Sequence, residues 1–152
     1  MQTAKEQKLE SLGDFLDQLL ETIDWTEHRK NDPVEHVWKF NKNCNRELTA
    51  LIASCLAYGR VEQIQMAIDE VMHALGTEPA QQLDNLTYPE LQKRLGDFNY
   101  RMTGAEDMLD LLWSVRGLRR KYGGLEACYR AADGHKHVEK ASNFVQILRQ
   151  RP

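Results

Sequence analysis

The chain has 152 residues, with 20 basic and 23 acidic side chains and a formal net charge of −3. This length is typical of one domain, and 41% hydrophobic with 28% charged residues is typical of a globular protein rather than a disordered one. A strongly basic nucleic-acid binder is excluded for the chain as a whole, but residues 1–76 carry a net charge of −5 and residues 77–152 one of +2. An anionic partner is therefore expected on the carboxyl-terminal half.

No apolar run approaches the roughly 18 residues that a membrane-spanning helix needs, so no bilayer crossing is expected. The amino end reads Met-Gln-Thr-Ala-Lys-Glu-Gln-Lys, and its charges are unlike the apolar stretch of a secretory signal. The three cysteines, Cys44, Cys55 and Cys128, are an odd number without short spacing, which predicts reduced thiols. These features indicate a cytoplasmic protein with a single domain over residues 1–152.

Helix-forming residues dominate the composition, since leucine occurs 19 times against 12 for valine and isoleucine together. Apolar residues recur at intervals of three and four, and no stretch of five or more alternates as a half-buried strand does. The sequence therefore predicts an all-α protein of about eight helices. The expected helical segments number nine, or eight if the two around Gly59 form one kinked helix. They are Thr3–Ile23, a short one from Pro33 to near Phe40, Arg46–Tyr58, Val61–Leu75, two short ones opening at Glu78 and Thr87, Ala105–Tyr122, Leu125–Ala132 and His137–Arg149.

Local signals set several boundaries. The polar stretch of residues 24–31 is expected to be a connection rather than a helix. Asn45 is a residue type that can cap the helix that follows it. Gly59 separates two apolar stripes, which indicates either an antiparallel helix pair or one long kinked helix. Thr87 and Glu90 have the spacing of a capping box.

The candidate chemical groups do not form a catalytic or metal-binding motif. His135 and His137, with Asp133 nearby, lack the further ligands and the spacing that zinc sites use, so a solvated loop is the better interpretation. Cys55 falls on an apolar stripe, where a thiol packs as a small hydrophobic group. There is no P-loop, dinucleotide glycine pattern or nucleophile elbow. No catalytic residue, metal ligand or cofactor is predicted.

The basic residues are more informative. The densest basic run, residues 116–121, either covers a solvated face or contacts phosphate. Residues 58–60, Tyr-Gly-Arg, place an aromatic and an arginine around a glycine at a turn, where a backbone can approach a ligand closely. Helix breaking is the other explanation of this glycine. The predicted nucleic-acid-binding residues are Tyr58, Gly59, Arg60, Arg101, Arg116, Arg119, Arg120 and Lys121.

Residues 45–132 resemble the amino-terminal helical part of the helix-hairpin-helix DNA glycosylase superfamily. A Glu-Pro helix, a Tyr-Pro-Glu-Leu helix and a helix ending Arg-Lys-Tyr-Gly-Gly-Leu follow in the order of those proteins. Asp32-Pro33, residues 56–60 (Leu-Ala-Tyr-Gly-Arg) and residues 98–102 (Phe-Asn-Tyr-Arg-Met) are more closely similar to an uncharacterised bacterial family, domain of unknown function 2400. That family itself resembles a divergent relative of the glycosylases. The resemblance covers nearly the whole chain and implies an all-helical fold.

The resemblance also implies what these residues lack. Glycosylases of the superfamily carry a glycine-rich hairpin that grips DNA phosphates and an aspartate that assists base cleavage, and neither motif occurs in the 152 residues. The chain is therefore expected to be truncated relative to the full family domain. The turn matching residues 58–60 often presents a glutamine that fills the gap left by a flipped base, and here the turn has none.

Two functions follow from this comparison. The resemblance implies a DNA-repair-like helical module that binds DNA weakly, without sequence preference, and is catalytically incomplete. The alternative is a non-catalytic structural or protein-interaction domain that keeps the fold without the DNA chemistry.

The last expected helix has an apolar stripe, which is expected to be partly open and to favour self-association. A homodimer through this carboxyl-terminal helix is therefore predicted. The stripe consists of Val138, Ala141, Phe144, Val145 and Leu148.

The missing hairpin and aspartate predict that this chain excises no base and nicks no abasic site. An incision assay over a panel of damaged duplexes tests this prediction. Salt-resistant turnover that disappears when a residue of this chain is mutated would contradict it.

Overall fold

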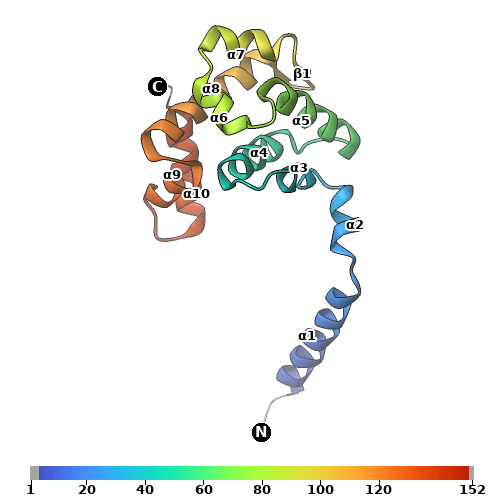
Figure 1. Ribbon diagram of the computed structural model, residues 1–152. Helices are drawn as coiled ribbons and strands as arrows, with labels where there is room; N and C mark the ends of the chain where they lie inside the picture. The colour runs from blue at the N-terminus through green and yellow to red at the C-terminus, as the bar shows by residue number, and fades with distance from the viewer. Residues whose placement is uncertain (1–3, 151–152) are drawn as a thin grey trace. The chain divides into compact units, whose positions relative to one another are not determined.

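A computed structural model describes the backbone of residues 4–150 and the side chains of residues 11–150. These residues form ten helices and one two-stranded sheet (Figure 1), so the predicted all-α class is confirmed. The chain divides into two compact units, Met1–Asp32 and Pro33–Pro152, which are described separately. The single domain over residues 1–152 stays a prediction.

The first unit contains α1 (Ala4–Thr22) and α2 (Trp25–Lys30). The prediction of α1 agrees closely with the structure, but the polar connection expected over residues 24–31 is wrong, because α2 lies there. The Asp24 carboxylate accepts the backbone N–H groups of Thr26 at 2.9 Å and Glu27 at 3.2 Å. This side-chain cap starts a helix that has no apolar stripe to reveal it.

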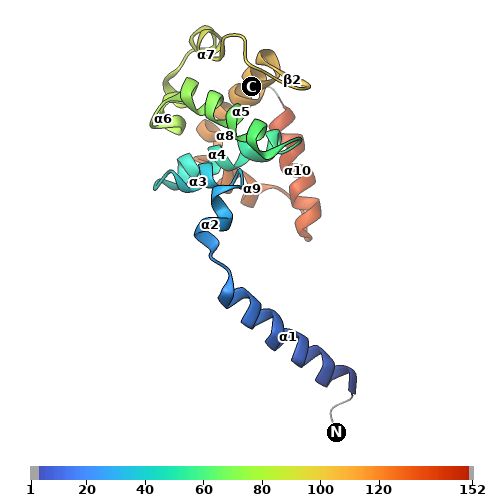
Figure 2. The ribbon, with the colours of Figure 1, turned by 90° about the vertical axis from the view of Figure 1, so that its right-hand side faces the viewer.

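The second unit holds the remaining elements. They are α3 (Glu35–Trp38), α4 (Asn43–Leu56), α5 (Val61–Leu75), α6 (Pro79–Asn85), α7 (Tyr88–Leu95), β1 (Asn99–Tyr100), β2 (Thr103–Gly104), α8 (Ala105–Tyr122), α9 (Leu125–Ala131) and α10 (His137–Arg149). Helix α4 contacts α3, α5, α6 and α9, and α8 contacts α6, α7, α9 and α10. Figure 2 shows α4, α5 and α8 in the middle of this unit.

One apolar core joins the helices of the second unit. Leu48, Ile52 and Leu56 are fully buried on α4, four residues apart, and they pack with buried side chains of α5 and α8. The expectation that Cys55 packs in this core is wrong, since Cys55 is exposed. It lies one residue, or about 100° of helix rotation, from the buried row. All three cysteines are free thiols, as predicted.

Asn45 has a different role from the predicted one. Helix α4 starts at Asn43, so Asn45 lies within it and does not cap it. Its buried side chain reaches α6 instead, where Oδ1 accepts the N–H of Ala80 at 3.1 Å and Nδ2 donates to Glu78 Oε2 at 2.8 Å. Asn45 therefore caps the amino end of α6 from a neighbouring helix.

A short hairpin that the sequence did not reveal precedes α8. Its antiparallel strands pair Asn99 with Gly104 and Tyr100 with Thr103. Two residues per strand are too few to produce an alternating pattern. Arg101, in the turn, has a φ of +55°, which is uncommon for a residue other than glycine.

The apolar stripe of α10 is partly covered. Phe144, Ile147 and Leu148 pack half-buried against the core, and Phe144 lies 5.9 Å from the Tyr129 ring. Val138 and Val145 stay exposed, at 78% and 41%. The homodimer through this helix stays a prediction, with a smaller open surface than the stripe alone suggests.

The capping role of Asn45 leads to a prediction about the free energy of unfolding. Asn45→Ala should lower the free energy of unfolding by about 1–3 kcal/mol, because it leaves the Ala80 N–H without a partner in the protein. Urea unfolding followed by circular dichroism measures the change. Asn43→Ala, in the exposed first turn of α4, is the control, and an equal loss in both variants would contradict the assigned role.

Candidate nucleic-acid interface

The structure brings the eight predicted binding residues into two groups rather than one. Tyr58, Gly59, Arg60 and Arg101 meet where the α4–α5 turn contacts the hairpin, whereas residues 116–121 lie in the second half of α8. Gly104 and Arg116 are separated by about 18 Å along the helix axis, at 1.5 Å per residue.

The first group is held by two tyrosines that bond to each other's backbone. The Tyr58 hydroxyl donates to the Tyr100 carbonyl at 3.1 Å and lies 2.6 Å from Thr103 Oγ1, while the Tyr100 hydroxyl donates to the Tyr58 carbonyl. The two rings pack with centroids 5.1 Å apart. Tyr58 is therefore a half-buried anchor between the turn and the hairpin.

Gly59 provides space for Arg101. It has a φ of +120°, and a Cβ atom there would lie 2.7 Å from Arg101 Nε. The Arg101 guanidinium crosses this position and donates to Gln63 Oε1 at 3.3 Å. Gly59 thus has a packing role in the turn after α4, and it places a cation over this turn.

Two exposed side chains, Arg60 and Met102, belong to the same part of the structure as Arg101. Arg60 is exposed immediately before α5, and its guanidinium has no hydrogen-bond or ion-pair partner among the described residues. Met102, beside Arg101 in the hairpin turn, is 88% exposed. The first group therefore offers two cations and one apolar side chain to a ligand.

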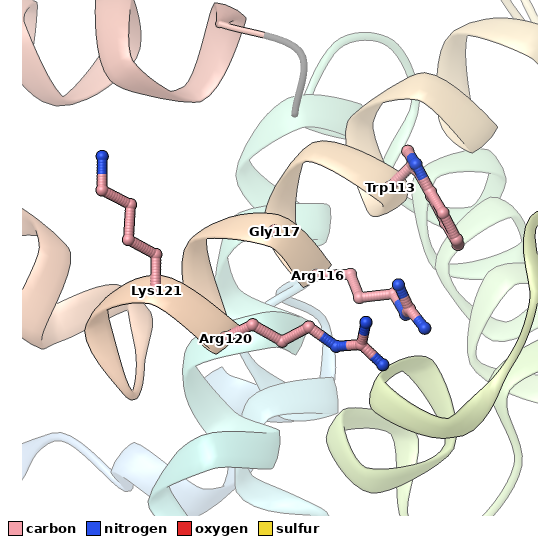
Figure 3. Close-up of a pocket in the computed structure, with 5 residues that line it drawn as sticks. All are labelled: Trp113, Arg116, Gly117, Arg120 and Lys121. Atoms are coloured by element: carbon pink, nitrogen blue, oxygen red, sulfur yellow. The ribbon is translucent and has the colours of Figure 1, made fainter.

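The second group borders a pocket of about 410 Å³ on α8 (Figure 3). Its lining residues are Trp113, Arg116, Gly117, Arg120 and Lys121, and no acidic residue is among them. Figure 3 shows the guanidinium groups of Arg116 and Arg120 extending to the same side of α8, while Lys121 extends in another direction. Sequence analysis missed Trp113, although its position three residues before Arg116 places both on one helix face.

Backbone carbonyls at the end of α6 orient the two arginines. Arg116 Nε donates to the Leu83 carbonyl at 3.1 Å, and Arg120 Nη2 donates to the Asp84 carbonyl at 2.9 Å. Carbonyls at a helix carboxyl end carry partial negative charge, so they favour these cations. Among the described residues, no carboxylate forms an ion pair with either guanidinium group.

Aromatic rings also hold the Arg116 side chain in position. Its guanidinium lies 4.4 Å from the centroid of the Trp113 ring, and the Tyr88 ring meets Trp113 edge-on at 5.3 Å. Burial and, next, the positive charge of Arg120 lower the pKa of Arg116. An anion in the pocket would reduce this repulsion between like charges.

Arg119 faces the interior and not the pocket. Its Nε and Nη2 atoms donate to Oδ1 and Oδ2 of Asp84 at 3.1 and 2.7 Å, and its side chain is only 9% exposed. The hydrogen bond to Asp84 raises the pKa of Arg119. Its Nη1 atom is buried without a hydrogen-bond partner, so Asp84 is the only residue of the described part of the chain to which this side chain hydrogen-bonds. Arg119 therefore forms a structural ion pair with Asp84.

The histidines and acidic residues do not form a metal site in the described part of the chain. Residues 11–150 contain no group of three or more histidine, cysteine or acidic side chains arranged to hold a metal ion. His137, one of the two histidines considered above, has its Nδ1 atom 2.6 Å from the Tyr129 hydroxyl. None of the described helices has the length and apolar character of a membrane span.

Comparison with known proteins identifies a family and nothing further. Residues 32–151 match the family model described as "Protein of unknown function (DUF2400)". No curated protein and no solved structure matches the chain significantly. The match covers the whole second unit up to residue 151 and agrees with the family resemblance of the sequence.

Because Arg119 points inward and Arg120 does not, substitutions of these two arginines should lower the free energy of unfolding by different amounts. Arg119→Gln should lower the free energy of unfolding by about 2–4 kcal/mol, because it leaves Asp84 partly buried without its partner. Arg120→Gln should cost about 1 kcal/mol or less, since Arg120 is exposed and loses one bond. Thermal and urea unfolding of both variants measure the difference. Equal losses would contradict the assignment.

Proposed function

We propose that this chain, which belongs to the DUF2400 family of proteins of unknown function, is a non-catalytic module that binds the phosphate backbone of nucleic acid weakly and without sequence preference. One observation carries the proposal. Arg116 and Arg120 extend to the same side of α8 beside a pocket that no carboxylate lines.

The geometry of the two arginines suits phosphate. A guanidinium has five N–H donors, and each of these arginines uses one on an α6 carbonyl, so other donors stay available for phosphate oxygens. The carbonyl bonds and the Trp113 ring already restrict the side chains. Binding therefore costs less rotamer entropy than it would for free surface arginines.

The hairpin group supplies the second contact in this proposal. Arg60 and Arg101 add two cations beyond the amino end of α8. That end, at Gly104, lies about 18 Å along the helix axis from Arg116, which is less than one turn of duplex DNA, about 34 Å. Exposed Met102 adds an apolar contact of the kind that many nucleic-acid-binding proteins place against bases. Arg119 is not among the proposed phosphate-binding residues, because it is paired with Asp84. Tyr58 and Gly59 hold Arg101 in position.

The divergent relationship to helix-hairpin-helix DNA glycosylases is part of the same proposal. It is supported by the sequence likeness over residues 45–132 and by helices at most of the expected positions. The absence of the glycosylase hairpin and aspartate from these residues limits the proposed role to binding.

Salt dependence of binding tests the proposal most directly. Fluorescence anisotropy with a labelled 20-nucleotide DNA, duplex or single-stranded, should show affinity that falls steeply between about 50 and 200 mM salt. Because each arginine–phosphate contact releases counterions, Arg116→Gln with Arg120→Gln should reduce the log–log slope by about two.

A charge-matched control accompanies this experiment. Lys93→Gln with Lys136→Gln removes the same charge from two exposed lysines outside the pocket, and it should change the slope much less. Equal effects of the two double variants would show that only net charge matters. Binding that does not respond to salt would also contradict the proposal.

The alternative of a protein-interaction domain is favoured by a different surface. An apolar groove of about 360 Å³ is lined by side chains of α4, α9 and α10. Its apolar lining comprises Ala50, Leu51, Leu125, Tyr129 and Phe144. Under this alternative, the arginine and control variants would have the same affinity for DNA.

A further inference from the structure

Helix α1 of the first unit presents a large apolar face. Five large apolar side chains on this helix are each about half exposed. They are Leu12 at 51%, Phe15 at 59%, Leu16 at 47%, Leu19 at 48% and Leu20 at 48%. An apolar face of this extent is unusual on a protein without a partner, and it marks an interaction surface.

The spacing on this face is that of a coiled coil. Leu12, Leu16, Leu19 and Ile23 follow at intervals of four, three and four residues, which are the a and d positions of a heptad. This arrangement forms a narrow seam that packs against another helix with the same repeat. Phe15 and Leu20 lie beside the seam and widen it.

The charges on α1 favour an identical partner. Coiled coils that select a different partner do so with charged residues at the positions flanking the seam. Here those positions, from residue 13 to 22, hold Gly13, Phe15, Leu20 and Thr22, and none of them is charged. The acidic residues Asp14, Asp17 and Glu21 lie on the opposite face of the helix, so two copies meet without like charges at the interface.

The second unit has no need of this face for its own core. Every buried residue of the core cluster lies between Leu48 and Cys128, within the second unit.

We infer that two copies of this chain associate through α1, which pairs with α1 of the second copy along the seam Leu12–Leu16–Leu19–Ile23. The named seam runs from residue 12 to residue 23, just past the last residue of α1, and so covers less than two full heptads. Such a short coiled coil is marginal, which makes the association weak and dependent on concentration. This interface is separate from α10 and does not depend on the proposed binding of nucleic acid.

Sedimentation equilibrium of the full chain over a concentration series tests the inference. The wild type should change from monomer to dimer as concentration rises. Leu16→Glu with Leu19→Glu should raise the dissociation constant at least about tenfold, because it buries charge in the seam. Ser11→Glu with Gln18→Glu adds the same charge away from the seam and should leave the dissociation constant nearly unchanged.

A strictly monomeric wild type would overturn the inference, as would a dimer that the seam variant does not weaken. In the second case Val138→Glu would show whether α10 provides the contact instead. Hydrogen exchange on the monomer gives a third outcome, since protection of α1 at low concentration would mean that the seam packs within its own chain. Circular dichroism of both double variants confirms that their helices are retained.

Discussion

The bidentate ion pair between Arg119 and Asp84 determines how α8 lies on α6, and the candidate binding pocket depends on this contact. Arg119 occupies both carboxylate oxygens of Asp84 from a position that is only 9% exposed. Arg116 and Arg120, three residues before and one after it, then reach the backbone carbonyls at the end of α6. The same contact occupies both oxygens of the Asp84 carboxylate, so neither of the two outer guanidinium groups forms an ion pair with it.

The fold could largely be predicted from the sequence, because apolar spacing in α4, α5 and α8 is regular and long enough to identify helices. Features created by contacts distant in sequence could not. Arg119 looked equivalent to Arg116 and Arg120, since its inward position depends on Asp84, 35 residues earlier. Asn45 has the residue type of a helix cap, and it does cap a helix, but the helix is α6 and not its own.

The residue types of the candidate site could be predicted from the sequence, but their arrangement in space could not. The basic run and the Tyr-Gly-Arg turn were visible as residue types, but their division into two groups, one at the hairpin and one in the second half of α8, appears only in the folded unit. The hairpin that carries Arg101 escaped detection because each strand has two residues. Trp113 was overlooked because an aromatic at helical spacing is usually a core residue.

The central claim is that Arg116 and Arg120 bind phosphate while Arg119 remains a structural residue. NMR of the arginine side-chain Nε–H groups measures this directly, in a titration of the isotope-labelled chain with a single-stranded oligonucleotide at low salt. The signals of Arg116 and Arg120 should shift together and saturate, while the signal of Arg119 stays in place. Unchanged signals for Arg116 and Arg120 while signals elsewhere in the chain shift, or an Arg119 signal that moves with them, would contradict the account.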